Sequence, residues 1–550
     1  MGVQVDHVVR TIAVCPAGAG CGTMVRKRGA TRPTARAARP GTGTRRSGAE
    51  GQTVKEACGV FGVYAPGRIV AQLTFDGLYA LQHRGQESAG MAVSDGESVM
   101  VVKDMGLVTT VFDERTLSGL PGHLAIGHTR YSTHGSSDWA AAQPVYRPAG
   151  RAGFALGHNG NLTNTAALAR RAGMLPGMVA TDSDVVAELV ARAQSGSGEG
   201  DPDALTRALR AVLPEVEGAF SLVLMDAGRL YGARDPQGFR PLCLGRLGDA
   251  GQPEGWVLAS ESPALDVIGA EFVRELEPGE LVTVDAGGVR AEQLFPSGRV
   301  EPHLCIFEFV YFARPDSRLY GREVHGTRRR MGELLAEQAP VAADLVMGVP
   351  DSGVPAAEGY ARRSGIPYGQ GLVKNRYIAR TFIAPDQQAR MDSVRRKLNP
   401  LRDNIAGKRL VVVDDSIVRG TTTRAIVGML RDAGAAEVHL RVSSPPFRWP
   451  CFYGIDTPDR DELLAADRSL DEVARHLGAD SVAYISLDNL KAAIDVPGGG
   501  FCEACLTGRY PVPVPVHVRP GTGAGAGRGE PGGAEGAPDP AVLQPAFPGV

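Results

Sequence analysis

An apolar run that ends in two adjacent carboxylates constrains the fold of this chain more than any other feature. Leu410–Val413 is apolar throughout, and Asp414 and Asp415 follow it directly. Such a run is typical of a strand buried on both faces, as in a parallel sheet covered by helices. A helical pattern follows at residues 424–434. Because ligands of these sheets bind at the carboxyl ends of the strands, the sequence predicts a ligand site at the two acids.

The residues between the acid pair and the helix indicate the chemistry of the ligand. A glycine and three hydroxyl residues stand there, namely Gly420, Thr421, Thr422 and Thr423. Backbone N–H groups of such a turn, where a helix opens, favour a phosphate. Asp414 and Asp415 would repel that phosphate, but they suit a sugar diol or a magnesium ion. A nucleotide P-loop is disfavoured because its Gly-Lys-Ser/Thr element is missing.

This stretch closely resembles the phosphoribosyl diphosphate (PRPP) signature of type I phosphoribosyltransferases. Two further segments fit the resemblance: Val349–Gly353 follows another apolar strand, and Lys374–Ile383 is similar to the mobile lid that closes over PRPP. The resemblance implies one Mg²⁺ per subunit, held by Ser352 with the two acids. It also implies a set of PRPP-binding residues, namely Lys374, Asp414, Asp415, Gly420, Thr421, Thr422 and Thr423.

A second group of motifs fills the N-terminal half. The segments are Cys58–Gly62, Leu81–Gly90, Gly127–Gly135, Gly157–Asn161 and Ala180–Asp184. Each is weak evidence alone. In this order and spacing they resemble the class II glutamine amidotransferase domain, which has an N-terminal-nucleophile fold.

The chemistry of an N-terminal nucleophile explains the position of Cys58. A thiol with a pKa near ~8.5 needs a base to become a thiolate, and the α-amino group of an N-terminal cysteine, with a pKa of about 8, supplies one. The bond between Ala57 and Cys58 must then be cut. The 57 residues before Cys58 make a longer leader than this family usually removes, which leaves the start site open.

The resemblance also implies a role for each residue of the glutamine site. Cys58 would attack the side-chain amide of glutamine, and Asn159 with the backbone N–H of Gly160 would form the oxyanion hole. Arg130 would bind the substrate α-carboxylate, and Asp182 the α-ammonium group. Three residues would play lesser parts: Thr133 and His134 would line the pocket, and Arg84 would support it.

Four other cysteines suggest a metal centre: Cys305, Cys451, Cys502 and Cys505. A lone CxxC could be redox-active, could bind zinc or could have no role. Four thiolates could equally hold zinc or a [4Fe–4S] cluster, so spacing leaves the metal open. One branch of the PRPP amidotransferases carries a cluster at matching positions. That resemblance implies one structural, oxygen-sensitive [4Fe–4S] cluster per subunit. No role follows for Cys15, Cys21 or Cys243.

The patterns divide the chain between two fold classes, α/β and α+β. Short β patterns interleaved with helical segments precede continuous apolar strands that alternate with helices. We expect an N-terminal-nucleophile αββα sandwich followed by a type I phosphoribosyltransferase parallel-sheet domain. The Arg-rich head reads as a disordered leader or propeptide, although such a head can imitate a transit peptide, and the Gly/Pro-rich tail as disordered. The expected boundaries are 1–57 (leader), 58–295 (amidotransferase), 296–497 (phosphoribosyltransferase), 498–518 (cluster-binding segment) and 519–550 (tail).

The whole body, residues 56–515, is similar to the glutamine phosphoribosyldiphosphate amidotransferases. The resemblance implies that glutamine, PRPP and water give 5-phosphoribosylamine, glutamate and diphosphate, with ammonia passing between two sites. It also implies feedback inhibition by purine nucleotides, a homotetramer and a cytoplasmic location. Two alternatives are a hexosamine-phosphate synthase and a PRPP-sensing DNA-binding regulator. With 59 basic and 61 acidic residues and no long apolar run, we expect neither a nucleic-acid nor a membrane partner.

Overall fold

The computed structural model describes most of the chain outside the two ends: residues 13–15, 58–131, 139–150, 152–175, 179–195, 201–375, 397–455, 457, 459–496 and 500–514. The predicted tail lies outside the described residues, as do nearly all of the predicted leader and the lid residues 376–383. The elements below belong to one compact unit.

Two antiparallel sheets form the N-terminal half. The eight-stranded sheet has the order β1-β4-β3-β5-β2-β11-β10-β12 and the six-stranded sheet β14-β13-β9-β8-β7-β6. Strands of the first are β1 (Ala13–Cys15), β2 (Gly59–Tyr64), β3 (Ser88–Ser94), β4 (Val99–Met105), β5 (Leu124–Arg130), β10 (Cys243–Asp249), β11 (Gln252–Ala259) and β12 (Glu271–Glu275). Strands of the second are β6 (Val145–Arg147), β7 (Phe154–Leu162), β8 (Gly218–Met225), β9 (Leu230–Arg234), β13 (Glu280–Asp285) and β14 (Gly288–Gln293).

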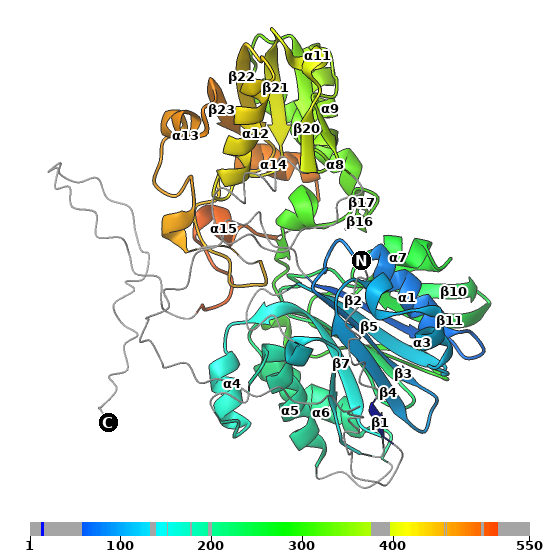
Figure 1. Ribbon diagram of the computed structural model, residues 1–550. Coiled ribbons are helices and arrows are strands. Elements are labelled where there is room, and N and C mark those ends of the chain that lie inside the picture. The colour runs from blue at the N-terminus through cyan, green and yellow to red at the C-terminus, as the bar shows by residue number, and fades with distance from the viewer. Residues whose placement is uncertain are drawn as a thin grey trace, which may run out of the picture. The chain divides into compact units, whose positions relative to one another are not determined.

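Helices cover the outer face of each sheet (Figure 1). On the first lie α1 (Val70–Ala80), α2 (Val108–Val111), α3 (Glu114–Ser118) and α7 (Pro263–Asp266); on the second lie α4 (Thr165–Arg171), α5 (Asp182–Gln194) and α6 (Ala204–Val212). Strand residues alternate between the helix-facing cores and a shared core between the sheets, to which Val60 and Val223 contribute. This confirms the αββα sandwich.

A four-stranded parallel sheet forms the centre of the C-terminal half, with the order β18-β21-β22-β23. Its strands are β18 (Leu345–Gly348), β21 (Arg409–Asp414), β22 (Glu437–Val442) and β23 (Ser481–Tyr484). Val411 and Val413 pack into one core, whereas Leu410 and Val412 pack into another on the opposite face. The apolar run is therefore buried on both sides, which confirms the predicted parallel sheet.

The helices of this half divide between the two cores. On one side are α8 (Val324–Gln338), α9 (Val354–Ser364) and α14 (Leu487–Ile494); on the other are α12 (Thr421–Asp432) and α13 (Leu470–Leu477). Smaller elements are β19 (Leu372–Lys374), β20 (Leu398–Pro400) and α11 (Arg402–Ile405), with single turns at Trp139–Ala141, Leu213–Glu215, Ser297–Arg299 and Arg460–Glu462.

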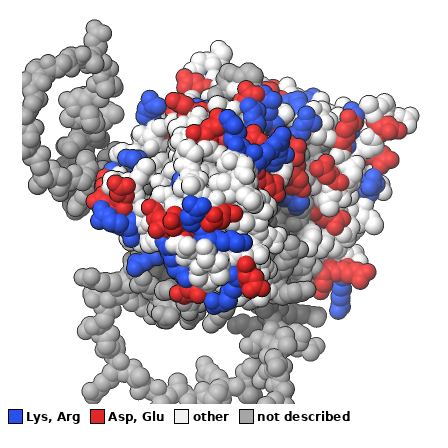
Figure 2. Space-filling model, turned by 90° about the horizontal axis from the view of Figure 1, so that it is seen from above, with Lys and Arg blue, Asp and Glu red and all other residues white. Residues whose placement is uncertain are grey.

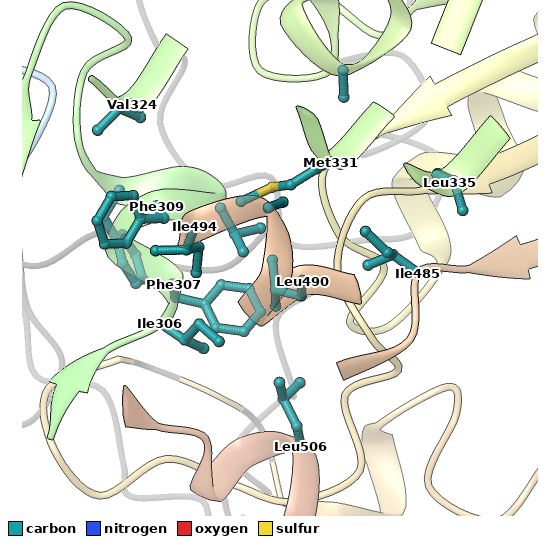
Figure 3. Close-up of a cluster of buried hydrophobic side chains, with 14 of the residues drawn as sticks. Ile306, Phe307, Phe309, Val324, Met331, Leu335, Ile485, Leu490, Ile494 and Leu506 are labelled. Carbon is teal, nitrogen blue, oxygen red and sulfur yellow. The ribbon is translucent and has the colours of Figure 1, made fainter. Parts of the chain in front are cut away.

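The segment after the sandwich is built into the C-terminal half. It comprises β15 (Leu304–Cys305), the π-turn η4 (Glu308–Phe312), β16 (Arg318–Leu319) and β17 (Arg322–Glu323). Figure 3 shows Phe307 and Phe309 beside Leu490 and Ile494 of α14 in one buried cluster. The end of the described chain, β24 (Phe501–Cys502) and α15 (Ala504–Thr507), returns here, since β24 pairs in parallel with β15.

One short element differs from the expectation of a leader without structure. Ala13–Cys15 forms β1, which pairs antiparallel with Val99–Val101 of β4. An apolar tripeptide can complete the open edge of a sheet in this way, because edge strands present unpaired backbone groups.

The surface offers no strong preference for a charged partner on the face in Figure 2, where basic and acidic side chains are interspersed. Within the described ranges, no helix is both long and apolar enough to cross a bilayer.

Candidate functional site

The acid pair and the glycine–threonine turn lie at the carboxyl end of β21, as the sequence predicts. The helix α12 begins at Thr421, three residues before the predicted start at Arg424. Gly420 accounts for the difference: its φ of +77° turns the chain sharply into the helix. A Cβ at Gly420 would lie 2.6 Å from Leu464 Cδ2, so a side chain there would press on Leu464. The threonines thus supply the first helical turn, whose N–H groups suit a phosphate.

The two carboxyl groups are buried side by side. Burial and the neighbouring Asp415 raise the pKa of Asp414 well above its ordinary value. Burial also raises the pKa of Asp415, although Ser352, Ser416 and Arg328 act in the opposite direction. Two buried carboxyl groups without a bound cation resist ionisation together, so a divalent ion that binds them would relieve their repulsion. This donor set fits Mg²⁺.

The two other predicted PRPP segments reach the same edge of the sheet. Val349–Gly353 follows β18, the parallel neighbour of β21, and the hydroxyl of Ser352 hydrogen-bonds the Asp415 side chain. Lys374 ends β19, and its Nζ lies 2.5 Å from Oδ2 of Asp351. The structure therefore brings Ser352, Lys374 and the acid pair together.

The predicted nucleophile lies immediately before β2. The Cys58 thiol donates to Tyr131 O at 3.6 Å. Burial raises the pKa of this thiol, and Arg130, Asp182 and Glu87 are near enough to act on the same pKa. The thiol therefore needs a base to ionise. Arg130 is buried at the end of β5, with its Nη1 3.5 Å from Oε2 of Glu87.

The predicted oxyanion-hole residues lie on β7. Asn159 is completely buried, and among the described residues neither its amide nitrogen nor its amide oxygen has a hydrogen-bond partner. A buried amide without partners is costly, so this side chain is suited to a ligand that supplies them. Gly160 has φ +151°, and a Cβ there would lie 2.0 Å from Ala219 O. Only glycine fits at this position.

The site contains one interaction that the sequence analysis missed. His158 Nδ1 lies 3.6 Å from Oδ1 of Asp182, whose Oδ2 accepts from Leu162 N at 3.0 Å. Ser183 N also donates to Oδ1, at 2.8 Å. These contacts fix the Asp182 carboxylate at the start of α5. No sequence signal linked His158 to Asp182.

Two predicted pocket residues, Thr133 and His134, lie outside the described residues.

A buried network of four ions connects the sandwich to η4. Nη2 of Arg84 lies 2.5 Å from Oε2 of Glu308, and Nη1 of Arg240 lies 3.2 Å from Oε1. Arg84 also pairs with Glu261, which His83 contacts at 2.7 Å. Sequence analysis expected Arg84 to support the site but could not identify its partners, which lie 177 and 224 residues away.

The four predicted cluster cysteines converge. Cys305 and Cys502 are opposite each other in the β15–β24 pair, and α15 carries Cys505. Burial raises the pKa of Cys505, as do the other three thiols, so all four are within electrostatic range. In the described part of the chain, no three metal-binding side chains are close enough for a single ion. A [4Fe–4S] cluster binds each thiolate through a different iron and so accepts wider spacing than zinc. Four thiolates are the donor type and number that a [4Fe–4S] cluster takes.

Comparisons with known proteins agree with this division into two sites. Residues 128–267 match the family described as "Glutamine amidotransferase domain", and residues 324–444 match "Phosphoribosyl transferase domain". The amidophosphoribosyltransferase of Mycobacterium leprae is 55% identical over 471 residues, covering 83% of this chain and 82% of that protein. The one from Bacillus subtilis is 44% identical over 470 residues, covering 84% and 96%.

A solved structure has the same architecture. The B. subtilis glutamine PRPP amidotransferase, complexed with ADP and GMP, matches with a TM-score of 0.75 at 42% identity. The match covers 84% of this chain and 98% of that chain.

Proposed function

The chain belongs to the amidophosphoribosyltransferase family, which catalyses the first step of purine biosynthesis, and on that basis we propose a role for each half of its site. This membership replaces the two alternatives, the hexosamine-phosphate synthase and the PRPP-sensing regulator. The observation that carries the proposal is that the amide of Asn159 is fully buried and has no hydrogen-bond partner among the described residues.

In the N-terminal half, Cys58 attacks the side-chain amide carbon of glutamine. Removal of residues 1–57 exposes the α-amino group of Cys58. This amino group takes the proton from the Cys58 thiol. Asn159 Nδ2 and the Gly160 N–H then stabilise the negative oxygen of the tetrahedral intermediate. Arg130 binds the α-carboxylate and Asp182 the α-ammonium, and Thr133 and His134 line the pocket. Ammonia leaves, and water releases glutamate from the thioester.

In the C-terminal half, the first turn of α12 binds the 5-phosphate of PRPP through N–H groups and the hydroxyls of Thr421, Thr422 and Thr423. Asp414 and Asp415 hold the ribose hydroxyls. Ser352, Asp414 and Asp415 would hold one Mg²⁺, which, when bound, neutralises charge on the diphosphate. Lys374 moves from Asp351 to the departing diphosphate. Ammonia then displaces diphosphate from C1 and forms 5-phosphoribosylamine.

We propose that this chain is of the iron–sulfur branch of the family, and its four converging cysteines support this. Cys305, Cys451, Cys502 and Cys505 would hold one [4Fe–4S] cluster, whose contribution is structural, since it fastens the end of the chain to β15. The B. subtilis relative is described with ADP and GMP. Purine nucleotides are accordingly the proposed inhibitors, acting on a cytoplasmic homotetramer.

Replacing the nucleophile tests the division of labour. Cys58→Ala should lose glutamine-dependent formation of phosphoribosylamine but keep the reaction with added ammonia, because the PRPP site is untouched. Cys243→Ala, which changes another buried thiol of the same half, should keep both activities. Loss of both activities in Cys58→Ala, with the fold intact by circular dichroism, would contradict the proposal. The intact mass of the wild type should be that of a chain that begins at Cys58.

A further inference from the structure

The loop that follows Cys451 lies directly against the strand that carries the oxyanion-hole residues. Nδ2 of Asn161 donates to Phe452 O at 2.8 Å. The next carbonyl, of Tyr453, accepts from Arg240, with distances of 3.0 Å to Nη2 and 3.2 Å to Nε. Two successive carbonyls of the loop are thus bound to the sandwich. In the chain, Asn161 and Phe452 are about 290 residues apart, and Arg240 and Tyr453 are 213 residues apart.

The next residue, Gly454, lies beside Gly160. Gly454 has φ +105°, and a Cβ there would lie 3.0 Å from Arg240 Nη2, 3.1 Å from Gly160 C and 3.3 Å from Gly160 Cα. Gly160 is also so close to β8 that a Cβ on Gly160 would meet Ala219 O at 2.0 Å. Gly160 therefore has close backbone neighbours both in β8 and at Gly454.

The loop has its own anchors, so it can act as a support. Tyr453 OH donates to Val512 O at 2.5 Å and accepts from Val512 N at 3.0 Å. The Tyr453 ring stacks on Phe239 with centroids 4.4 Å apart. Arg240, which binds the Tyr453 carbonyl, is itself held by Glu308. These contacts fix the loop before any substrate binds.

We propose that Phe452–Gly454 positions Gly160, so that its N–H points to the oxyanion formed during glutamine hydrolysis. The inference rests on the proposed role of Gly160 and adds a positioning element from the far half of the chain. An oxyanion-hole donor must lie within ~3 Å of the developing charge, and losing one donor typically costs about 10²–10³ in kcat. A small displacement of Gly160 therefore changes the chemical step more than the binding of glutamine.

Gly454→Ala tests the proposal, with Gly288→Ala as the matched control. Both glycines have a positive φ, +105° and +95°, but a Cβ at Gly288 meets nothing within 4 Å. Both variants should lose similar stability through backbone strain. Gly454→Ala should also lower kcat with glutamine about tenfold or more, with KM for glutamine and inhibition by glutamate unchanged. Ammonia-dependent activity should match the wild type.

Asn161→Ala removes the bond to Phe452 without adding an atom, and decides the question if Gly454→Ala fails to fold. Asn164→Ala is its control, because Asn164 Nδ2 donates to a carbonyl of the same half, Glu215 O, at 2.9 Å. Asn161→Ala should lower kcat with glutamine, and Asn164→Ala should not.

Asn159→Ala separates this inference from the assignment on which it rests. If Asn159→Ala lowers kcat with glutamine but Gly454→Ala and Asn161→Ala leave it at the control level, the positioning role is wrong and the oxyanion hole stands. If Asn159→Ala keeps full kcat, the oxyanion hole itself is wrong, and the positioning role is rejected with it.

Discussion

His158 and Asp182 form a buried pair, with Nδ1 of the imidazole 3.6 Å from Oδ1 of the carboxylate. Burial lowers the pKa of His158, but Asp182, the Ala219 carbonyl and Asp235 together more than offset this and leave the pKa raised. Burial likewise raises the pKa of Asp182, yet His158 and two backbone N–H groups leave it lowered. Each residue therefore favours the charged form of the other, in the proposed binding site of the substrate ammonium.

The stability of the pair depends on pH. The ordinary pKa of histidine is 6.5, and the folded value for His158 lies above it. The contribution of His158 to the stability of the folded protein is therefore complete below pH 6.5 and is lost as pH rises through the folded-state pKa. His158→Gln should lower the free energy of unfolding by about 1–3 kcal/mol at pH 6, with a smaller difference from the wild type at pH 9. Urea denaturation at both values measures this, and an equal difference at both would contradict it.

Asp414→Asn should abolish both the glutamine-dependent and the ammonia-dependent reactions, because the carboxylate serves the PRPP site that both share. The substrate-free protein should nevertheless become more stable. Since the folded-state pKa of Asp414 is raised, stability is lost as pH rises from its ordinary value of 3.8 through the folded value. The melting temperature of the variant should exceed that of the wild type at pH 8. Asp471→Asn, an exposed change on α13, is the control for both readouts.

Gly420→Ala should weaken PRPP binding specifically. Its control is Gly478→Ala, since the two glycines have φ of +77° and +76°. Both substitutions should lower the free energy of unfolding by about 1–2 kcal/mol, because alanine is strained in a left-handed backbone conformation. Only at Gly420 does a Cβ press on a neighbour, Leu464 Cδ2 at 2.6 Å, and we expect the turn to shift in response. KM for PRPP should rise about tenfold in Gly420→Ala alone, an effect worth ~1.4 kcal/mol. Equal KM values in the two variants would rule out this role of the turn.

The cysteine centre can be identified by analysis of protein purified without air. The wild type should contain about four iron and four sulfide ions per chain, with a brown chromophore. Cys502→Ser should lose iron and sulfide. Cys243→Ala should keep them, because the Cys243 thiol donates to Ala259 O at 3.3 Å and belongs to a different core cluster from the other four cysteines. A wild type that holds one zinc ion and no sulfide would refute the cluster.

The sequence predicted those parts of the site that are local in the chain. Asp414 and Asp415 follow an apolar run, and Cys58, Asn159 and Gly160 lie within short motifs, so a role could be proposed for each before the fold was known. The sequence analysis placed the start of α12 three residues late, because a run of threonines has weak helix propensity. In the structure, the turn at Gly420 starts the helix at Thr421 despite that weak propensity.

The interactions that the sequence could not predict join distant residues. Glu308 binds Arg84 and Arg240, and Gly454 lies beside Gly160. No periodicity or spacing in the sequence indicates that these residues are neighbours. The interactions depend on how the sandwich and the C-terminal half pack together, which is decided by the burial of side chains over both surfaces.

The buried carboxylate of Glu308 has a consequence for how this chain can be divided. Its two arginine partners precede residue 295, whereas Glu308 follows it. A fragment that stops at the predicted boundary would leave Arg84 with Glu261 alone and would leave Arg240 without its carboxylate partner. Stranded charges of this kind are strongly destabilising. An autonomous glutaminase fragment must therefore extend past η4, and gene fusions that exchange one half for a foreign partner must carry that turn along with the arginines.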